Sequence, residues 1–231
     1  MTADLKAASA RVRATVPAEQ RLRITEIFHS LQGESRTVGL PTMFVRLTGC
    51  PLRCTYCDTE YAFYGGYWHS FEDILAEVAR HGAQHVCVTG GEPLAQRSCI
   101  GLLRALCDAG YTVSLETGGA MDVSQVDSRV MKVVDLKTPD SGEMDRNRWE
   151  NLEHLSPYDA LKFVICSRAD YEWARVKLRE YALERKCEVL FSPGYGRQDS
   201  RELAEWILED RLPVRFQVQL HKILWGEEQG R

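Results

Sequence analysis

The stretch of sequence that decides how this chain folds and acts reads Gly49-Cys50-Pro51-Leu52-Arg53-Cys54-Thr55-Tyr56-Cys57-Asp58. Its cysteines, Cys50, Cys54 and Cys57, have the spacing C-x3-C-x2-C and offer three thiolates. Most four-iron clusters are held by four cysteine thiolates and transfer electrons. A compact triad without a local fourth ligand therefore indicates a 4Fe-4S cluster with one open iron, to which a small molecule can bind.

Structural zinc and buried thiols are the competing interpretations of these cysteines. Tetrahedral zinc takes a fourth Cys or His, usually from a second paired motif, and the sequence has no second C-x2-C. A non-catalytic iron–sulfur electron carrier would also need a fourth ligand. The remaining cysteines lie mostly in apolar runs and are expected to be small core residues. They are Cys87, Cys99, Cys107, Cys166 and Cys187.

Length and composition favour one large domain that binds a small molecule. A chain of 231 residues with 44% hydrophobic content has enough material for one core, and we expect a single domain over 22–231 after an N-terminal arm over 1–21. The net charge of −4 argues against partners bound by bulk electrostatics, which excludes nucleic acid and an acidic membrane surface. The chain has no N-terminal apolar signal region and no stretch near the ~20 apolar residues of a membrane span. Its cysteines then indicate a reducing cytoplasm.

The hydrophobic pattern alternates helix and strand from residue 70 onward. A helix is expected to begin at the capping-box-like Ser70-Phe71-Glu72-Asp73 and to end before Gly82. Further helices are predicted over 94–109, 169–185 and 200–209, and strands over 42–47, 85–88, 111–115, 131–136, 161–166, 188–191 and 215–220. These strands are too few for a closed eight-stranded barrel, so we predict an α/β fold: an open partial (β/α) barrel with a mainly parallel sheet.

The polar residues of interest follow the predicted strands. Active sites of such sheets gather at the carboxyl ends of the strands. The segments found there are Thr48-Gly49-Cys50, Thr89-Gly90-Gly91-Glu92-Pro93, Glu116-Thr117-Gly118-Gly119, Asp135-Leu136-Lys137 and, after the last strand, His221.

The cysteine triad and Gly90-Gly91-Glu92-Pro93 together resemble the two signatures of the radical S-adenosylmethionine superfamily. Alone, the second run could be only a tight strand-to-helix turn. The resemblance implies an open iron that chelates the methionine part of S-adenosylmethionine, and an electron that cleaves the sulfonium to a 5′-deoxyadenosyl radical. A Gly-Gly turn lets backbone groups approach the methionine amine.

Four further segments narrow the resemblance to the 7-carboxy-7-deazaguanine synthase family. They are Ser30-Leu31-Gln32-Gly33-Glu34, Phe44-Val45-Arg46-Leu47, Cys57-Asp58-Thr59 and Gln219-Leu220-His221-Lys222. The resemblance runs from about Ile24 to Lys222. It implies a homodimer that converts 6-carboxy-5,6,7,8-tetrahydropterin to 7-carboxy-7-deazaguanine with loss of ammonia, on the route to queuosine, with magnesium and an electron donor such as flavodoxin.

The same resemblance assigns roles to single residues. It implies substrate contacts for Leu31, Gln32, Gly33, Glu34, Arg46, Thr89 and His221. It implies S-adenosylmethionine contacts for Tyr56, Gly90, Gly91, Glu92, Glu116, Asp135, Leu136, Lys137 and Ser192. Thr59 would ligate Mg²⁺, which prefers oxygen ligands.

Other readings stay open for some of these residues. Without the resemblance, Thr59 could be a turn residue, and His221 could be a strand-end histidine bonded to backbone. Asp135 and Lys137 could form an exposed ion pair. The sequence after Lys222 departs from the family pattern. A glycyl-radical-enzyme activase of the same superfamily is the alternative enzyme, although such an enzyme is expected to lack the Gln32 and His221 segments.

Overall fold

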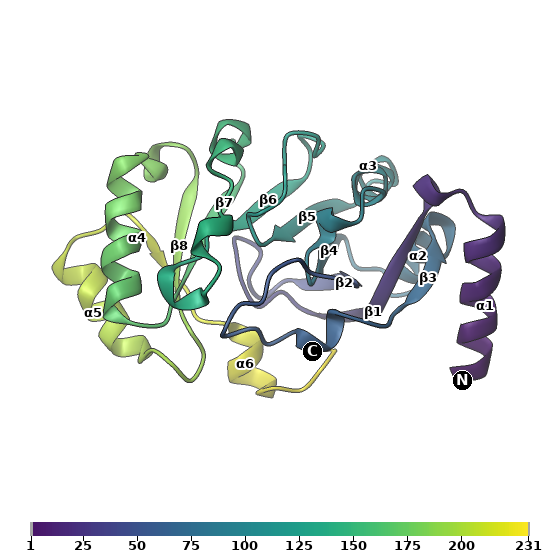
Figure 1. The fold of residues 1–231 in the computed structure, drawn as a ribbon, viewed down its shortest axis with the longest axis horizontal. Coiled ribbons are helices and arrows are strands. Elements are labelled where there is room, and N and C mark those ends of the chain that lie inside the picture. Colours follow the sequence, from purple (N-terminus) through teal and green to yellow (C-terminus); the bar gives the residue numbers. More distant parts are fainter. Residues whose placement is uncertain (1, 231) are drawn as a thin grey trace.

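The computed structural model describes residues 2–230, in which nine strands form one sheet. The strands are β1 (Arg21–Leu31), β2 (Pro41–Leu47), β3 (Tyr67–Ser70), β4 (His85–Gly90), β5 (Thr112–Thr117), β6 (Met131–Asp135), β7 (Ala160–Ile165), β8 (Glu188–Pro193) and β9 (Arg215–Phe216). Their order across the sheet is β3-β1-β2-β4-β5-β6-β7-β8-β9. β1 is antiparallel to β2 and β3, and every pair from β2 to β9 is parallel. The sheet is an open arc (Figure 1), which confirms the predicted α/β fold.

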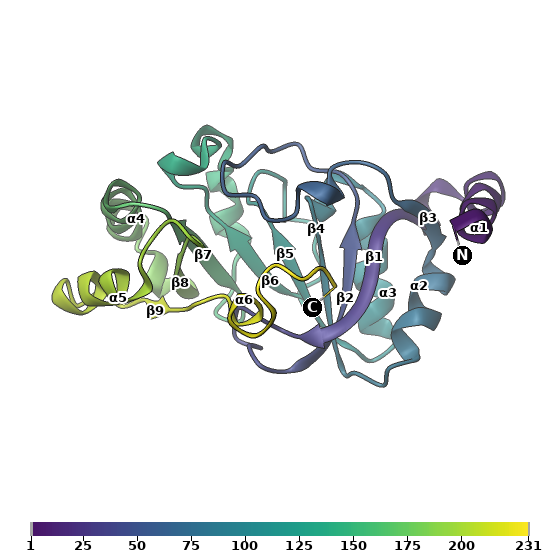
Figure 2. The same ribbon diagram turned by 90° about the horizontal axis from the view of Figure 1, so that it is seen from below.

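Six α-helices accompany the sheet. They are α1 (Thr2–Thr15), α2 (Phe71–Ala79), α3 (Cys99–Asp108), α4 (Arg168–Glu180), α5 (Ser200–Glu209) and α6 (Leu220–Trp225). Helix α2 packs on β1 and β3, α3 on β5, and α4 on β7. Figure 2 shows α4 and α5 at one end of the curved sheet, α2 and α3 nearer the other, and α6 crossing in front of the strands between them. None of these helices is long and apolar enough to cross a membrane, within the described residues.

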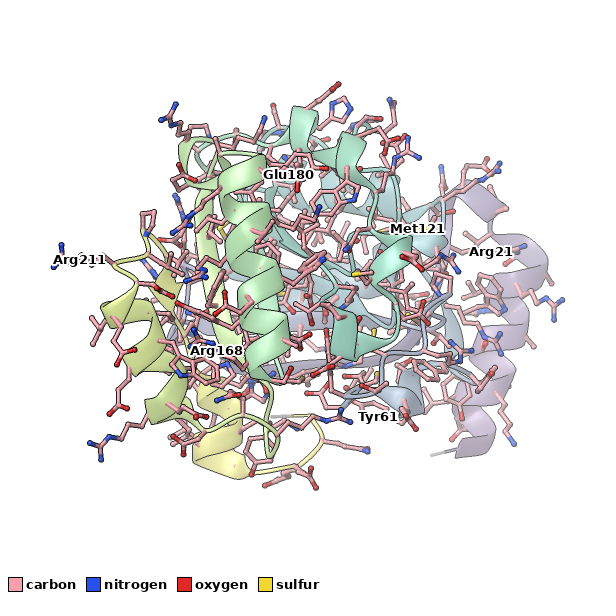
Figure 3. All side chains as sticks on the ribbon, turned by 60° about the vertical axis from the view of Figure 1, so that its left-hand side comes forward. Arg21, Tyr61, Met121, Arg168, Glu180 and Arg211 are labelled. Atoms are coloured by element: carbon pink, nitrogen blue, oxygen red, sulfur yellow. The ribbon has the colours of Figure 1, made fainter. Side chains whose placement is uncertain are left out.

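The hydrophobic core lies between the sheet and its helices. Strand β4 is buried from Val86 to Thr89, as expected for a parallel strand covered on both faces. Figure 3 labels Arg168 and Glu180 at the two ends of α4, and core side chains fill the space behind this helix. Phe163, Tyr171 and Phe191 are fully buried there and meet edge to face, which suits the electrostatics of aromatic rings.

Several predicted elements are confirmed. The capping box at the start of α2 is present, because Ser70 Oγ accepts from Asp73 N–H and the Asp73 carboxylate accepts from Ser70 N–H. Helix α5 has the predicted bounds, and the predicted strands from β2 to β8 agree with the observed ones to within about two residues at each end. The N-terminal arm is helical, and Ser9 Oγ in α1 accepts from Trp68 N–H on the edge strand β3.

Other predictions are wrong. The prediction lacked β1 and β3. The helix predicted over 94–109 is split into a 3-10 turn, Pro93–Ala95, and α3, because Gln96 between them is extended and its side chain bonds backbone groups of Arg23 and Thr48. The helix predicted over 169–185 ends at Glu180, since Ala182 adopts a positive φ of 47°. The last strand stops at Phe216, so His221 lies in α6 and not on a strand.

Candidate active site

A cavity of about 450 Å³ lies at the carboxyl ends of the parallel strands. Its volume is in the range of sites that enclose small ligands. Most of the residues predicted for cluster, cofactor or substrate line it: Leu31, Gln32, Gly33, Glu34, Arg46, Cys50, Cys54, Tyr56, Cys57, Thr59, Thr89, Gly90, Gly91, Glu116, Asp135, Lys137 and His221. Three predicted residues do not line it. Glu92 is buried behind the wall, Leu136 belongs to the core, and Ser192 is 1% exposed.

The cysteine loop is held by backbone hydrogen bonds at both ends. Gly49 N–H donates to the carbonyl of Ala62 (2.8 Å), and Thr55 N–H donates to the carbonyl of Ser141 (3.0 Å). Cys50, Cys54 and Cys57 are half-buried thiols, and burial raises the pKa of each, so a metal must displace their protons on binding.

Among residues 2–230, no three His, Cys, Asp or Glu side chains converge closely enough to hold one metal ion.

The Gly-Gly turn after β4 lies against the cysteine loop with no room for a side chain. A Cβ on Gly91 would be 2.5 Å from the Gly49 carbonyl oxygen and 2.7 Å from Cys50 Cβ. A Cβ on Gly90 would be 2.6 Å from the carbonyl oxygen of Leu47. The two glycines therefore bring bare backbone to the cavity wall beside the thiols.

Glu92 fixes this turn from behind. Its carboxylate is fully buried and accepts hydrogen bonds from Leu94 N–H, Thr117 Oγ1 and Gly118 N–H, at 2.8 to 3.0 Å. Burial raises the pKa of Glu92, and these donors oppose the rise. Each such bond to an ionised group contributes about 1.5–3 kcal/mol. Glu92 thus acts as a brace between the ends of β4 and β5.

Charged side chains form a chain along the cavity floor. Glu116 Oε1 accepts from Gln32 Nε2 (3.2 Å), and burial, reinforced by the charge of Glu34, raises the pKa of Glu116. Lys162 on β7 lies 3.0 Å from Glu34 Oε2, and Lys137 lies 2.9 Å from Asp135 Oδ2. The Asp135–Lys137 pair is largely buried and so differs from the exposed pair considered from sequence.

Arg46 on β2 is aimed by two neighbours. Its Nε donates to Glu26 Oε1 (2.7 Å), which also accepts from the Tyr61 hydroxyl (2.7 Å). The guanidinium lies over the ring of Phe28, 5.6 Å from its centroid. Arg46 is therefore a preorganised cation in the wall, and a guanidinium can grip a carboxylate in two places.

Helix α6 brings His221 onto the loop after β1. Leu220 N–H donates to the Gly33 carbonyl (3.0 Å), and a Cβ on Gly33 would meet His221 Nδ1 at 2.2 Å. Burial lowers the pKa of His221, although Glu34 and Asp58 oppose the shift. On the same side, the Thr59 hydroxyl donates to Asp58 Oδ1 (2.7 Å), which leaves the lone pairs of Thr59 Oγ1 available to a cation.

The sequence prediction missed several residues of this site. Lys162, Glu26 and Gln217 are the clearest. A lysine inside the apolar run 160–165 was a usable signal for Lys162. Gln217 gives no such signal. Its amide pairs with both backbone groups of Ser35, accepting from N–H at 2.5 Å and donating to the carbonyl at 2.9 Å, and only the fold brings these segments together.

The residues present fit a cluster with a bound nucleoside cofactor. Three thiols come from one loop, and side-chain-free backbone lies beside them. Among the cavity-lining residues in the described part of the chain, the Tyr56 hydroxyl, Asp135 Oδ1 and Glu34 Oε1 are buried without a hydrogen-bond partner. Buried polar atoms are normally bonded, so these atoms mark where a polar ligand would bind.

Comparison with known proteins agrees with the fold and the site. The sequence pattern of the Radical SAM superfamily matches residues 44–137, which include the cysteine triad and the Gly-Gly turn. The fold resembles the crystal structure of QueE from Escherichia coli, with a TM-score of 0.72 and 24% identity over 92% of this chain and 98% of that one. The matched motifs and the fold both point to the radical S-adenosylmethionine superfamily.

Two curated relatives identify the family within it. A 7-carboxy-7-deazaguanine synthase from Chlorobaculum tepidum is 45% identical over 91% of this chain and 97% of its own length. Another from Koribacter versatilis is 45% identical over 90% and 98%. The chain belongs to the 7-carboxy-7-deazaguanine synthase family.

The contact of Gly33 with His221 predicts the effect of a single methyl group. Gly33→Ala should push α6 off the loop, because the new Cβ would overlap the imidazole. We expect backbone amides over 219–225 to exchange with deuterium at least ten times faster than in the wild type, as a local opening would allow. Gly82→Ala is the control, since Gly82 lies outside the cavity lining and its Cβ meets nothing within 4 Å. Equal exchange in both variants would contradict the contact.

Proposed function

We propose that this protein converts 6-carboxy-5,6,7,8-tetrahydropterin to 7-carboxy-7-deazaguanine with loss of ammonia, as a lyase in the biosynthesis of queuosine and other 7-deazapurines. The observation that carries the proposal is one cavity of about 450 Å³ that joins the three thiols and the Gly-Gly turn to Gln32, Glu34 and Arg46. The first group suits a radical-generating cofactor, and the second suits a small anionic heterocycle.

The cofactor part of the cavity would be held by the chain as follows. The thiols of Cys50, Cys54 and Cys57 would ligate a 4Fe-4S cluster, and the bare backbone of Gly90 and Gly91 would lie along bound S-adenosylmethionine. When bound, the cluster and S-adenosylmethionine supply the 5′-deoxyadenosyl radical that abstracts hydrogen from the substrate. Tyr56, Glu116, Asp135 and Lys137 would offer polar atoms around that position, with Glu92, Leu136 and Ser192 buried behind them.

The part of the cavity proposed for the substrate would bind the pterin through charge and hydrogen bonds. Arg46, fixed by Glu26, would bind the substrate carboxylate. Glu34 Oε1 would accept from ring N–H groups, and His221, whose pKa burial lowers, would close the site from α6. Leu31, Gln32, Gly33 and Thr89 complete the contacts. A carbon radical reacts with whatever lies nearest, so this fixed positioning decides the product.

The finer parts of the proposal concern metal, partners and location. Thr59 Oγ1, beside Asp58, would ligate Mg²⁺. By likeness to the family, residues 22–231 would act as one domain in a cytoplasmic homodimer that receives electrons from a donor such as flavodoxin. The charge balance gives no support to nucleic-acid binding.

The reaction is tested with anaerobically reconstituted protein, dithionite, S-adenosylmethionine and the pterin. We expect 7-carboxy-7-deazaguanine and ammonia in equal amounts, with many turnovers for each S-adenosylmethionine. Glu34→Ala should lose product formation at least a hundredfold while cluster and cofactor binding change little. No product from this pterin, or one 5′-deoxyadenosine released for every product molecule, would reject the proposal and favour an activase.

The ligand assignment predicts the iron content of cysteine variants. Wild-type protein should bind ~4 irons per chain, and alanine at Cys50, Cys54 or Cys57 should abolish the cluster absorption, because each of the three thiolates would hold one iron of the cluster. Cys107→Ala is the control, since Cys107 packs against the core. A full absorption band in Cys54→Ala would show that the assignment is wrong.

The assignment of Thr59 to magnesium predicts that a variant can lose the response to Mg²⁺ and keep the cleavage of S-adenosylmethionine. Thr59→Ala removes the oxygen beside Asp58, so product formation should respond at least fivefold less to added Mg²⁺. Thr59→Ser keeps the hydroxyl and should respond like the wild type. Uncoupled cleavage of S-adenosylmethionine should persist in both variants. An unchanged response in Thr59→Ala would remove Thr59 from the site.

A further inference from the structure

A buried lysine, Lys162, occupies the centre of the cavity floor and has no role so far. It lies on β7, its side chain is 11% exposed, and its Nζ is 3.0 Å from Glu34 Oε2 and 3.8 Å from Asp135 Oδ2. Glu34 lies after β1 and Asp135 at the end of β6. Lys162 is therefore a cation between two carboxylates. One is Glu34, which we propose contacts the substrate, and the other is Asp135, in the wall that we propose contacts the cofactor.

Lys162 is charged in this position. Burial alone lowers the pKa of a lysine, but the carboxylates of Glu34, Asp135 and Glu116 outweigh burial and raise the pKa of Lys162. The ammonium therefore orients the Glu34 carboxylate directly and the Asp135 carboxylate together with Lys137. A buried ion pair of this kind is weak support for stability by itself, because desolvation offsets much of the attraction.

Two carboxylate oxygens near Lys162 have no hydrogen-bond partner among the described residues, and they indicate the role of this ion-pair arrangement. Lys162 approaches one oxygen of each carboxylate. The other oxygens, Glu34 Oε1 and Asp135 Oδ1, are buried and have no hydrogen-bond partner anywhere in residues 2–230. Both residues line the cavity. Lys162 thus holds Glu34 by a hydrogen bond to Oε2, and it shares Asp135 Oδ2 with Lys137, which is nearer at 2.9 Å. In each carboxylate the second oxygen is left for a ligand.

A second buried lysine pair in the same sheet has the opposite character. Lys132 Nζ lies 3.1 Å from Asp159 Oδ2, and both residues are at least as buried as Lys162. In this pair, both carboxylate oxygens of Asp159 accept hydrogen bonds from the protein. Asp159 Oδ1 accepts from Lys132 N–H, and Oδ2 accepts from Ser156 N–H and Oγ. Neither residue lines the cavity, so this pair is structural.

We propose that Lys162 is a positioning residue that sets Glu34 against the substrate and Asp135 against the cofactor. The inference rests on the proposed function for the identity of the two ligands. Because the ammonium hydrogen-bonds Glu34 and adds its charge to that of Lys137 beside Asp135, its loss should weaken both binding steps. It should weaken substrate binding more, since Glu34 is the nearer partner.

The test compares Lys162→Met with Lys132→Met in cluster-loaded protein. With the cluster oxidised, so that no turnover occurs, equilibrium dialysis gives the Kd for the pterin and for S-adenosylmethionine. We expect Lys162→Met to raise the Kd for the pterin at least tenfold and that for S-adenosylmethionine three- to fivefold. Under reducing conditions it should release more 5′-deoxyadenosine per product. Lys162→Arg should recover part of the pterin affinity. Lys132→Met should lower the melting temperature and leave both Kd values unchanged.

A double variant shows whether Lys162 acts through Glu34. Glu34→Gln with Lys162→Met removes both charges and so avoids an unpaired buried carboxylate if the single variant does not fold. Its Kd for the pterin should equal that of Glu34→Gln alone. Additive losses, or a pterin Kd in Lys162→Met within twofold of the wild type, would overturn the inference. If the wild type does not bind the pterin, the proposed function fails, and the Kd for S-adenosylmethionine then decides the role of Lys162: a change below twofold overturns it.

Discussion

The close contact between the Gly-Gly turn and the cysteine loop is the constraint on which the rest of the site depends. Glu92 N–H donates to the Gly49 carbonyl at 2.8 Å, and Gly91 N–H donates to the carbonyl of Leu47. A side chain at Gly91 would separate the two segments. Parallel pairing of β2 with β4 brings both strand ends to one edge, and these bonds then fix the thiols relative to that edge. The Glu92 carboxylate extends the same constraint to β5 through Thr117 and Gly118, so three strand ends form one rigid wall.

The cavity combines this rigid wall with a balanced set of charges. Carboxylates at Glu34, Glu116 and Asp135 face the ammonium groups of Lys137 and Lys162, and Arg46 is paired with Glu26. Each group is buried enough that a missing partner would be costly, because an unpaired buried charge loses its hydration without compensation. Preorganised charges need no reorganisation when a polar ligand binds. The same arrangement explains why some carboxylate oxygens remain without partners in an otherwise satisfied network.

The sequence predicts the parts of this structure that rest on local chemistry. The triad, the Gly-Gly turn and the Ser70 capping box all have short, fixed spacings, and each lies where it was expected. The sequence did not predict the parts that depend on contacts between distant segments. Gln96 interrupts the expected long helix because its amide bonds Arg23 and Thr48, more than forty residues away. Gln217 pairs with Ser35 across 182 residues of sequence, and no local pattern indicates that pairing. The expectation that His221 directly follows a strand over 215–220 fails: the apolar residues there suit a strand locally, but β9 stops at Phe216 and Leu220 begins α6, which docks on Gly33.

Helix α6 shows how one glycine links local and distant requirements. The helix has only Leu220–Trp225, too short to be stable alone in water, so tertiary contacts must hold it. Leu220 N–H bonds the Gly33 carbonyl, and Lys222 lies 3.5 Å from Asp58 Oδ2, next to the cysteine loop. Leu220 of the helix therefore contacts the loop after β1, which carries Gly33, and Lys222 contacts the end of the cysteine loop. Gly33 lacks a side chain because the imidazole of His221 occupies that space, and Gln217 bonds the backbone of Ser35, two residues further on, in its positive-φ conformation. The chain thus completes its cavity with a segment that is ordered only because the rest of the wall is already in place.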